Sequence, residues 1–411
     1  MTGSWHSGAR PHGWFGLPPM LATVAATTVG LLPVFLTGTL AVQIGRDLTL
    51  STTRLGIAVA AFFGSSAVCS AGLGRLSDRV GSTAMMRWGI APAVVALLAI
   101  GLGIHRFWEL AVALTVAGVA NGAIQPAANR YLTRTTNTHR QGFAFGVKQA
   151  AIPAATLLSG LAVPVVAHIA SWRSAFFGAA VLAVAVAVLI RRPDRKVRIP
   201  RPVEHETATP PAFARPALIR LAIGVGLASA AANAMGSFFV LSAVSIAVTD
   251  SHAGLVAAVG SAASLLVRLG VGARADRRAV GHLRLVSGLC AAGAAGMLLL
   301  AAGEPRLLLL AAIIGYGAGW GWAGLFNFAV VSTHPAAPGR ATGLTQVGTS
   351  IGACLGPLCF GFTAVHVGYP PAWIAAAVLL LAAALVILAG RRALDAAGVI
   401  DAASHDGPTN R

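Results

Sequence analysis

Twelve long apolar segments follow one another along this chain of 411 residues, and they limit its possible folds more than any other feature. Charged residues make up only 10% of the sequence, whereas soluble domains contain about 25%. Most of the segments reach the ~20 residues that a helix needs to cross the hydrocarbon core of a bilayer, although the third and the sixth are short. We therefore predict an all-α membrane protein with twelve transmembrane helices, at about residues 19–44, 55–73, 87–104, 108–129, 142–167, 174–190, 216–246, 252–273, 283–303, 306–331, 342–366 and 372–390.

The formal net charge of +18 would indicate a nucleic-acid partner in a soluble protein. The positions of the 30 lysines and arginines point elsewhere. With both termini in the cytosol, most of these residues fall in cytosolic segments, as the positive-inside rule requires. We predict a multi-pass protein of the cytoplasmic (inner) cell membrane, with both termini cytosolic and no nucleic-acid partner. The basic residues left outside are Arg46, Arg54, Arg106, Arg173 and Arg306.

The chain divides into two halves of six apolar segments each. The stretch between them, "RRPDRKVRIPRPVEHETATPPAFAR", is charged and rich in proline, which is typical of a linker. Shifting the sequence by 198 residues places Gly74 on Gly272 and Asp78 on Asp276, and parallel repeats of this kind occur in secondary transporters. The predicted organisation is a cytosolic tail at 1–16, a six-helix half at 17–191, a cytosolic linker at 192–215, a second six-helix half at 216–391 and a cytosolic tail at 392–411.

A short charged motif, "GRLSDRVG" at residues 74–81, follows the second apolar segment, and a looser copy, "GARADRRAVG", begins at Gly272. The motif, the twelve segments and the basic linker resemble the major facilitator superfamily, whose signature here is Gly-x-Leu-Ala/Ser-Asp-Arg/Lys-x-Gly-Arg/Lys-Arg/Lys. The sequence departs from it at Ser82 and Thr83, where two basic residues usually follow. The resemblance covers about residues 17–392. It implies that family's fold, in which two pseudo-symmetric six-helix halves rock around a central site.

The resemblance also gives the two motif copies a gating role. Asp78 is expected to meet the positive amino-terminal end of the eleventh helix near Thr342, a contact that typically contributes about 0.3–1 kcal/mol. Asp276 is expected to mirror it near Gly142, while the motif glycines permit close helix approach and a tight reversal. The alternative is an ordinary loop of solvated charges. The predicted gating residues are Gly74, Asp78, Arg79, Gly81, Gly272, Asp276 and Arg277.

Charged residues within the segments bear on the substrate. None of the 12 acidic residues lies deep in a segment, and carriers of organic cations usually need a buried acid. Lys148 and Arg268 lie about 9 Å and about 8 Å from the cytosolic ends of the fifth and eighth segments, at 1.5 Å per residue. In the family those two helices pack together, so the two cations favour an anionic substrate. The alternative is snorkelling, in which both stems lie in lipid and both head groups reach the interface.

Other polar residues complete the expected substrate pathway, since helices one, four, seven and ten largely line the central cavity in the family. An amide in lipid costs free energy unless it is paired or faces water. Each amide therefore either bonds a neighbouring helix or contacts the ligand, and the equivalent pair Asn129 and Asn327 favours the structural role. The predicted pathway residues are Lys148, Gln149, Arg268, Asn121, Gln125, Asn233, Trp320 and Asn327.

No motif indicates an enzyme, a cofactor or a metal site. "GWGWAG" at 319–324 matches a dinucleotide fingerprint by letter, but it lies inside an apolar segment, where small-residue helix packing explains it. The four cysteines lie in apolar segments without metal-ligand spacing.

We predict a monomeric secondary active transporter that moves a small organic solute, specifically an anion, across the lipid bilayer by alternating access. An exporter of neutral hydrophobic compounds or drugs and a non-transporting membrane sensor with the same fold remain alternatives. A coupling proton is left open.

Overall fold

The structure is a computed structural model that describes residues 18–48, 50–135, 141–169, 171–190, 214–275, 277, 281–334 and 338–398. The described residues contain helices and no β-strand. The elements are α1 (Pro19–Thr39), α2 (Ala41–Leu48), α3 (Thr52–Val80), α4 (Ser82–Gly103), α5 (Phe107–Thr135), α6 (Gln141–Gln149), α7 (Ala151–Ile169), α8 (Arg173–Leu189), α9 (Arg215–Ser245), α10 (Asp250–Ala275), α11 (His282–Ala301), η2 (Pro305–Leu307), α12 (Leu308–Gly321), α13 (Ala323–Thr333), α14 (Pro338–His366) and α15 (Tyr369–Ala396).

The twelve predicted membrane helices are confirmed. Within the described ranges, eleven helical stretches are long and apolar enough to cross a bilayer. The twelfth is the shorter apolar helix α8, as the short sixth segment indicates. The third segment is also predicted to be short. Its helix α4 has 22 residues, because it begins at Ser82, within the charged region before the apolar run.

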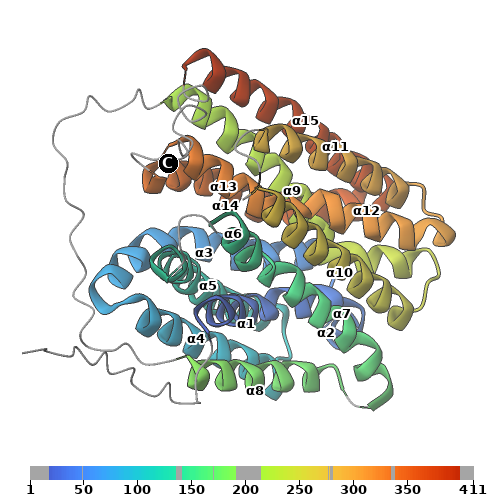
Figure 1. The fold of residues 1–411 in the computed structure, drawn as a ribbon. Coiled ribbons are helices and arrows are strands. Elements are labelled where there is room, and N and C mark those ends of the chain that lie inside the picture. Colours follow the sequence, from blue (N-terminus) through green and yellow to red (C-terminus); the bar gives the residue numbers. More distant parts are fainter. Residues whose placement is uncertain are drawn as a thin grey trace, which may run out of the picture.

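The helices gather in two groups. Figure 1 shows the blue-to-green helices α1 to α8 on one side and the light-green-to-red helices α9 to α15 on the other. The groups meet along two seams, α3 against α14, and α6 with α7 against α10. Glycine permits these close approaches. A Cβ on Gly56 would lie 2.7 Å from the carbonyl oxygen of Pro357, and one on Gly160 would lie 2.7 Å from that of Gly254.

Three predicted segments are each broken into two helices. The breaks lie at Leu40 between α1 and α2, at Ala150 between α6 and α7, and at Trp322 between α12 and α13. At the second break Pro153 has no backbone N–H, so the carbonyl of Gln149, four residues earlier, loses its helical donor. A carbonyl inside a membrane must then find another partner.

The charged motif differs from the predicted loop. Residues 74–80 form the last turns of α3, and the chain reverses at Gly81, whose φ is 91°. The 29 residues of α3 extend about 43 Å at 1.5 Å per residue, which exceeds the ~30 Å hydrocarbon core. Charged residues can therefore remain helical beyond the membrane. The positive φ explains why glycine occupies the reversal.

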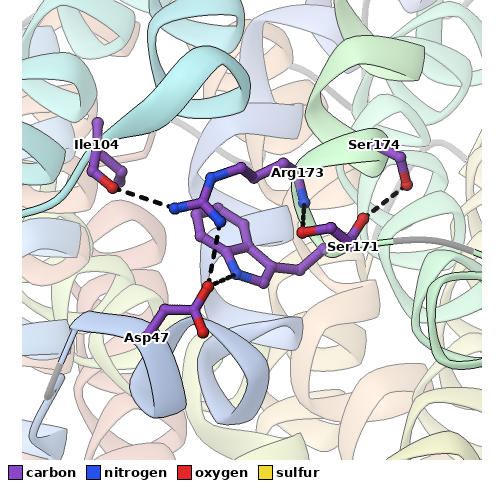
Figure 2. Close-up of polar contacts among 6 residues, drawn as sticks. Asp47, Ile104, Ser171, Arg173 and Ser174 are labelled. Atoms are coloured by element: carbon purple, nitrogen blue, oxygen red, sulfur yellow. Dashed lines mark hydrogen bonds and ion pairs between the residues drawn. The ribbon is translucent and has the colours of Figure 1, made fainter.

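A polar cluster lies at the end of the first half opposite to the charged motif (Figure 2). The carboxylate of Asp47 accepts a hydrogen bond of 2.8 Å from the indole of Trp172 and forms an ion pair of 3.1 Å with Arg173. Arg173 also donates to the carbonyl of Ile104 over 3.3 Å. The cluster thus ties the ends of α2, α4 and α8 together.

Some of the contacts between the halves lie at this same end. Gln43 on α2 donates to the carboxylate of Asp250 on α10 over 2.9 Å. Thr53 on α3 donates to the carbonyl of Gly361 on α14 over 3.4 Å. Together with the Gly56–Pro357 approach, these contacts hold the two halves together on the side away from the charged motif.

Parts of the predicted organisation lie outside the described residues. These are the tail at 1–16, positions 192–213 of the linker, Asp276 in the second motif copy, and positions 399–411 of the second tail. α15 continues to Ala396, past the predicted start of the tail at 392.

Candidate functional site

A cavity of about 190 Å³ lies between the two halves. α1, α3, α5, α6 and α7 supply its walls on one side, and α9, α12, α13 and α14 supply them on the other. Its polar lining is Ser66, Ser70, Asn121, Gln125, Asn129, Lys148, Gln149, Ser229, Asn233, Asn327, Gln346, Thr349 and Ser350.

The structure brings most of the predicted pathway residues together. All of them except Arg268 line this cavity, although they come from five different helices. The cavity lining includes one basic side chain, Lys148, and no aspartate or glutamate. An anion could therefore approach a positive charge here without meeting a carboxylate.

Lys148 is buried, with 4% of the residue exposed. Its ammonium group donates a hydrogen bond to Oε1 of Gln125 on α5. The amide of Gln125 donates to Oδ1 of Asn121 over 3.3 Å, and Asn121 donates to the hydroxyl of Ser66 on α3 over 2.9 Å. The lysine therefore begins a polar chain that crosses three helices. This placement contradicts snorkelling, which would carry the head group to the interface.

Arg268 differs from the expectation that both cations face the cavity. It is 1% exposed and lies behind the cavity wall. Its guanidinium donates to the carbonyl of Gln149 on α6 and, over 2.6 Å, to that of Trp320 on α12. The first of these is the carbonyl freed by Pro153. Arg268 thus holds the backbone of two residues whose side chains line the cavity, and it does so across the interface between the halves.

The remaining predicted amides play different parts. Asn233 donates to the carbonyl of Ser229 one turn earlier, over 2.8 Å, and Ser229 donates across to the carbonyl of Thr349 on α14 over 2.9 Å. Asn129 and Asn327, expected to be structural, are partly exposed and line the cavity. These two side chains are therefore candidates for contact with a ligand.

An aromatic wall adjoins the polar lining. Trp320 packs edge-on against Phe35 with ring centroids 5.6 Å apart, and its centroid lies 5.9 Å from that of Tyr316. Trp320 is 3% exposed, so packing accounts for most of its surface. Trp320 belongs to the lining of the cavity together with Lys148 and Gln149.

Several lining residues were missed from the sequence, namely Ser66, Ser70, Ser229, Gln346, Thr349 and Ser350. A signal was present. Ser66 and Ser70 are four residues apart, and Gln346, Thr349 and Ser350 have spacings of three and four, so each set lies on one helix face. Polar residues on one face of an otherwise apolar membrane helix indicate a face turned away from lipid.

The gating residues that the structure describes lie at the end of the molecule away from the polar cluster. Asp78 forms an ion pair with Arg130 on α5, and its side chain is 55% exposed. Arg79 and Arg277 are exposed. Gly272 packs closely on Gly146. A Cβ added to Gly146 would lie 3.3 Å from the Cα of Gly272. An added Cβ on Gly74, by contrast, would make an ordinary contact of 3.6 Å with Pro126, so the structure gives no steric reason for glycine there.

Within the described residues, no group of three or more histidine, cysteine, aspartate or glutamate side chains could hold a metal ion. Two six-helix halves around a central polar cavity define the class of alternating-access membrane carriers.

The comparisons with known proteins agree with this class. The family model for the Major Facilitator Superfamily matches residues 21–335 and 221–404. The chain therefore belongs to the major facilitator superfamily, and it is a transporter of that type. It acts in a lipid bilayer on a small-molecule solute.

Two curated relatives are uncharacterized MFS-type transporters from Mycobacterium tuberculosis, strains CDC 1551 / Oshkosh and ATCC 25618 / H37Rv. Each is 28% identical to this chain, over 332 and 333 residues respectively, covering 75% of this chain and 71% of the relative. Among solved structures, a crystal structure of the nucleoside transporter NupG superposes with a TM-score of 0.69 at 14% identity, covering 91% of this chain and 100% of that one. This last likeness shows the fold alone.

Proposed function

We propose that this transporter carries a small organic anion and that Lys148 binds the anionic group. The observation that carries the proposal is the position of Lys148 as the charged side chain of the cavity lining, with no carboxylate among its neighbours there. A buried cation without a counter-ion costs free energy, and an anionic substrate would remove much of that cost. Gln125 accepts a hydrogen bond from the ammonium group and holds it at the cavity wall.

The size and polarity of the cavity support a small polar solute. About 190 Å³ corresponds to roughly six water molecules at about 30 Å³ each, and drug-sized pockets start near ~300 Å³. Amides and hydroxyls make up most of the polar lining. Export of a neutral hydrophobic drug would leave these groups unpaired, so that alternative fits the cavity less well.

The packing along α3 and α14 supports a route for alternating access. These helices are in contact near Gly56 and Pro357, whereas Ser66, Ser70 and Gln346, which lie nearer the motif end, line the cavity. Opening the first region and closing the second would expose the site to the opposite side of the membrane. We further propose that the motif end is cytosolic, that the membrane is the inner cell membrane and that the protein works as a monomer.

The residues that line the cavity limit which groups could carry a coupled proton. Its lining contains no aspartate, glutamate or histidine. A coupled proton would therefore travel on Lys148 or on the substrate itself. Uptake into proteoliposomes with and without an imposed pH gradient tests this.

A thermal-shift screen of the purified protein identifies the substrate class. The panel consists of matched pairs, each a small carboxylate or phosphate and its neutral amide or alcohol. A ligand at 100 times its Kd stabilises the folded state by about 2.7 kcal/mol. We expect anionic members to raise the melting temperature of the wild type and not that of Lys148→Ala. A shift by the neutral members alone would contradict the proposal, and binding without net flux in proteoliposomes would indicate a sensor.

A further inference from the structure

A second hollow lies on the outer side of the second half. It is an apolar groove of about 560 Å³ in which α9 forms the floor and α14 and α15 form the walls. Among its lining residues, Ile223, Val347 and Ile351 are each more than half exposed. A groove of this kind on a membrane protein opens to the lipid rather than to the substrate cavity.

The groove is built into the backbone packing. α14 crosses α9 so closely that a Cβ on Gly352 would lie 1.9 Å from the carbonyl oxygen of Gly226, and one on Gly356 would lie 2.3 Å from that of Ala230. Side chains cannot fill this crossing. The glycines and alanines of the lining, among them Ala230, Gly352 and Gly356, leave space for a hollow beside the two helices.

The dimensions match one acyl chain. Along α9 the lining extends from Ile219 to Ala234, which is about 22 Å at 1.5 Å per residue. One leaflet contributes about half of the ~30 Å hydrocarbon core. The groove is longer than this, so an acyl chain can lie in it over the full thickness of its leaflet. A methylene group occupies slightly less space than a water molecule, about 30 Å³. The groove volume of about 560 Å³ therefore holds roughly twenty such groups.

Positive charge marks one end of the groove. Arg215 precedes Ile219, the first lining residue of α9, by four positions, and Arg340 precedes Leu344, the first lining residue of α14, by four. Residues four apart lie on the same helix face, so each arginine continues the lining face by one turn. Both arginines are exposed, and neither helix has an acidic residue in its first turn. The positive ends of two helix dipoles add to this charge.

We propose that the groove binds one anionic phospholipid, with an acyl chain along α9 and the phosphate between Arg215 and Arg340. The apolar hollow accounts for the chain and the paired arginines for the preference for negative charge. That the cytosolic leaflet supplies this lipid rests on the orientation proposed above, whereas the binding itself does not.

Native mass spectrometry tests this site on the full-length protein released from vesicles of phosphatidylcholine and phosphatidylglycerol. We expect one phosphatidylglycerol to be retained in preference to phosphatidylcholine. Arg215→Gln and Arg340→Gln should each lower that preference about fivefold, the usual effect of one cation near an anionic lipid. Arg284→Gln is the matched control, because Arg284 is exposed in the first turn of α11 and does not line the groove.

A second pair of variants tests the acyl chain. Ile223→Trp enlarges a lining residue and should displace the lipid although both arginines remain. Ile374→Trp enlarges an exposed residue outside the groove and should leave retention unchanged. Thermal unfolding confirms that each variant is folded. The proposal is overturned if the double variant Arg215→Gln/Arg340→Gln keeps the full preference, if Ile223→Trp retains the lipid, or if a second protein copy covers the groove and excludes lipid.

Discussion

The ammonium group of Lys148 and the amide oxygen of Gln125 form a hydrogen bond that joins α6 to α5 at the wall of the central cavity. The bond gives the lysine a neutral partner, so its positive charge is not cancelled. A neutral partner is what an anion-binding site requires, because the substrate then supplies the missing negative charge. Transport by each variant is measured with the anionic substrate that the thermal-shift screen identifies.

Gln125→Glu tests whether the uncancelled charge is the essential property. The glutamate keeps the length of the side chain and its acceptor oxygen, but it adds a carboxylate beside Lys148. We expect the variant to fold with wild-type stability or better, since it pairs a buried cation. We expect anion uptake into proteoliposomes to fall at least tenfold. Uptake at the wild-type rate would show that net charge at this position does not select the substrate.

Arg268 is expected to act through positioning. Arg268→Met removes the donors to the carbonyls of Gln149 and Trp320, and each buried acceptor left unpaired costs about 1–3 kcal/mol. Thermal unfolding in detergent should show a clear loss of stability in Arg268→Met. The stability of Arg268→Lys should lie between those of the wild type and Arg268→Met, because a single ammonium cannot reproduce the guanidinium fork. An unchanged melting temperature in Arg268→Met would show that the hydrogen bonds from Arg268 to these two carbonyls do not stabilise the protein.

Asp78→Asn is expected to reduce transport strongly with little loss of folded protein. Its ion pair with Arg130 is partly exposed and contributes about 1 kcal/mol or less. Arg130→Gln removes the same ion pair but keeps the carboxylate that is expected to meet the start of α14. Transport should therefore survive better in Arg130→Gln than in Asp78→Asn. Equal losses would assign the effect to the ion pair, and normal transport by Asp78→Asn would leave the motif as a topological signal only.

The second copy of the motif gives a matched comparison. Asp276→Asn should reduce transport less than Asp78→Asn, because the sequence around it departs further from the family signature. Uptake rates of the two variants, normalised to folded protein, decide this. A larger effect at Asp276 would reverse the assigned roles of the two copies.

Orientation can be tested with single cysteines in a background without the four native ones. His105→Cys lies in the exposed turn after α4, and Gly343→Cys lies near the start of α14, where an added Cβ meets no atom within 4 Å. In intact cells an impermeant thiol reagent should label position 105 and not position 343. The reverse pattern would invert the proposed topology.

The sequence predicts the membrane helices well because each must bury about 20 apolar residues in lipid whatever its neighbours are. It predicts most of the cavity because polar side chains such as Asn121 and Gln125 are costly anywhere else in a membrane. The position of Arg268 was not predicted, since hydropathy places it at the same depth as Lys148 but carries no information on which carbonyls it meets. Pro153 was the available signal, because it frees the carbonyl of Gln149.

The extent of α3 was also missed. Charged residues ended the apolar run at Leu73, and hydropathy cannot tell a helix that leaves the membrane from a loop. The positive φ of Gly81 shows where the helix ends. Ser66 and Ser70 were missed because serine is small and weakly polar, so only their spacing marks the cavity face.

The sharpest test of the anion site is uptake of the anionic substrate by Lys148→Ala, normalised to folded protein and compared with Lys148→Arg. We expect Lys148→Ala to remain folded and to lose anion uptake, and Lys148→Arg to retain part of it because the charge stays while the donor geometry changes. A fully active Lys148→Ala would contradict the anion site and would favour transport of a neutral solute.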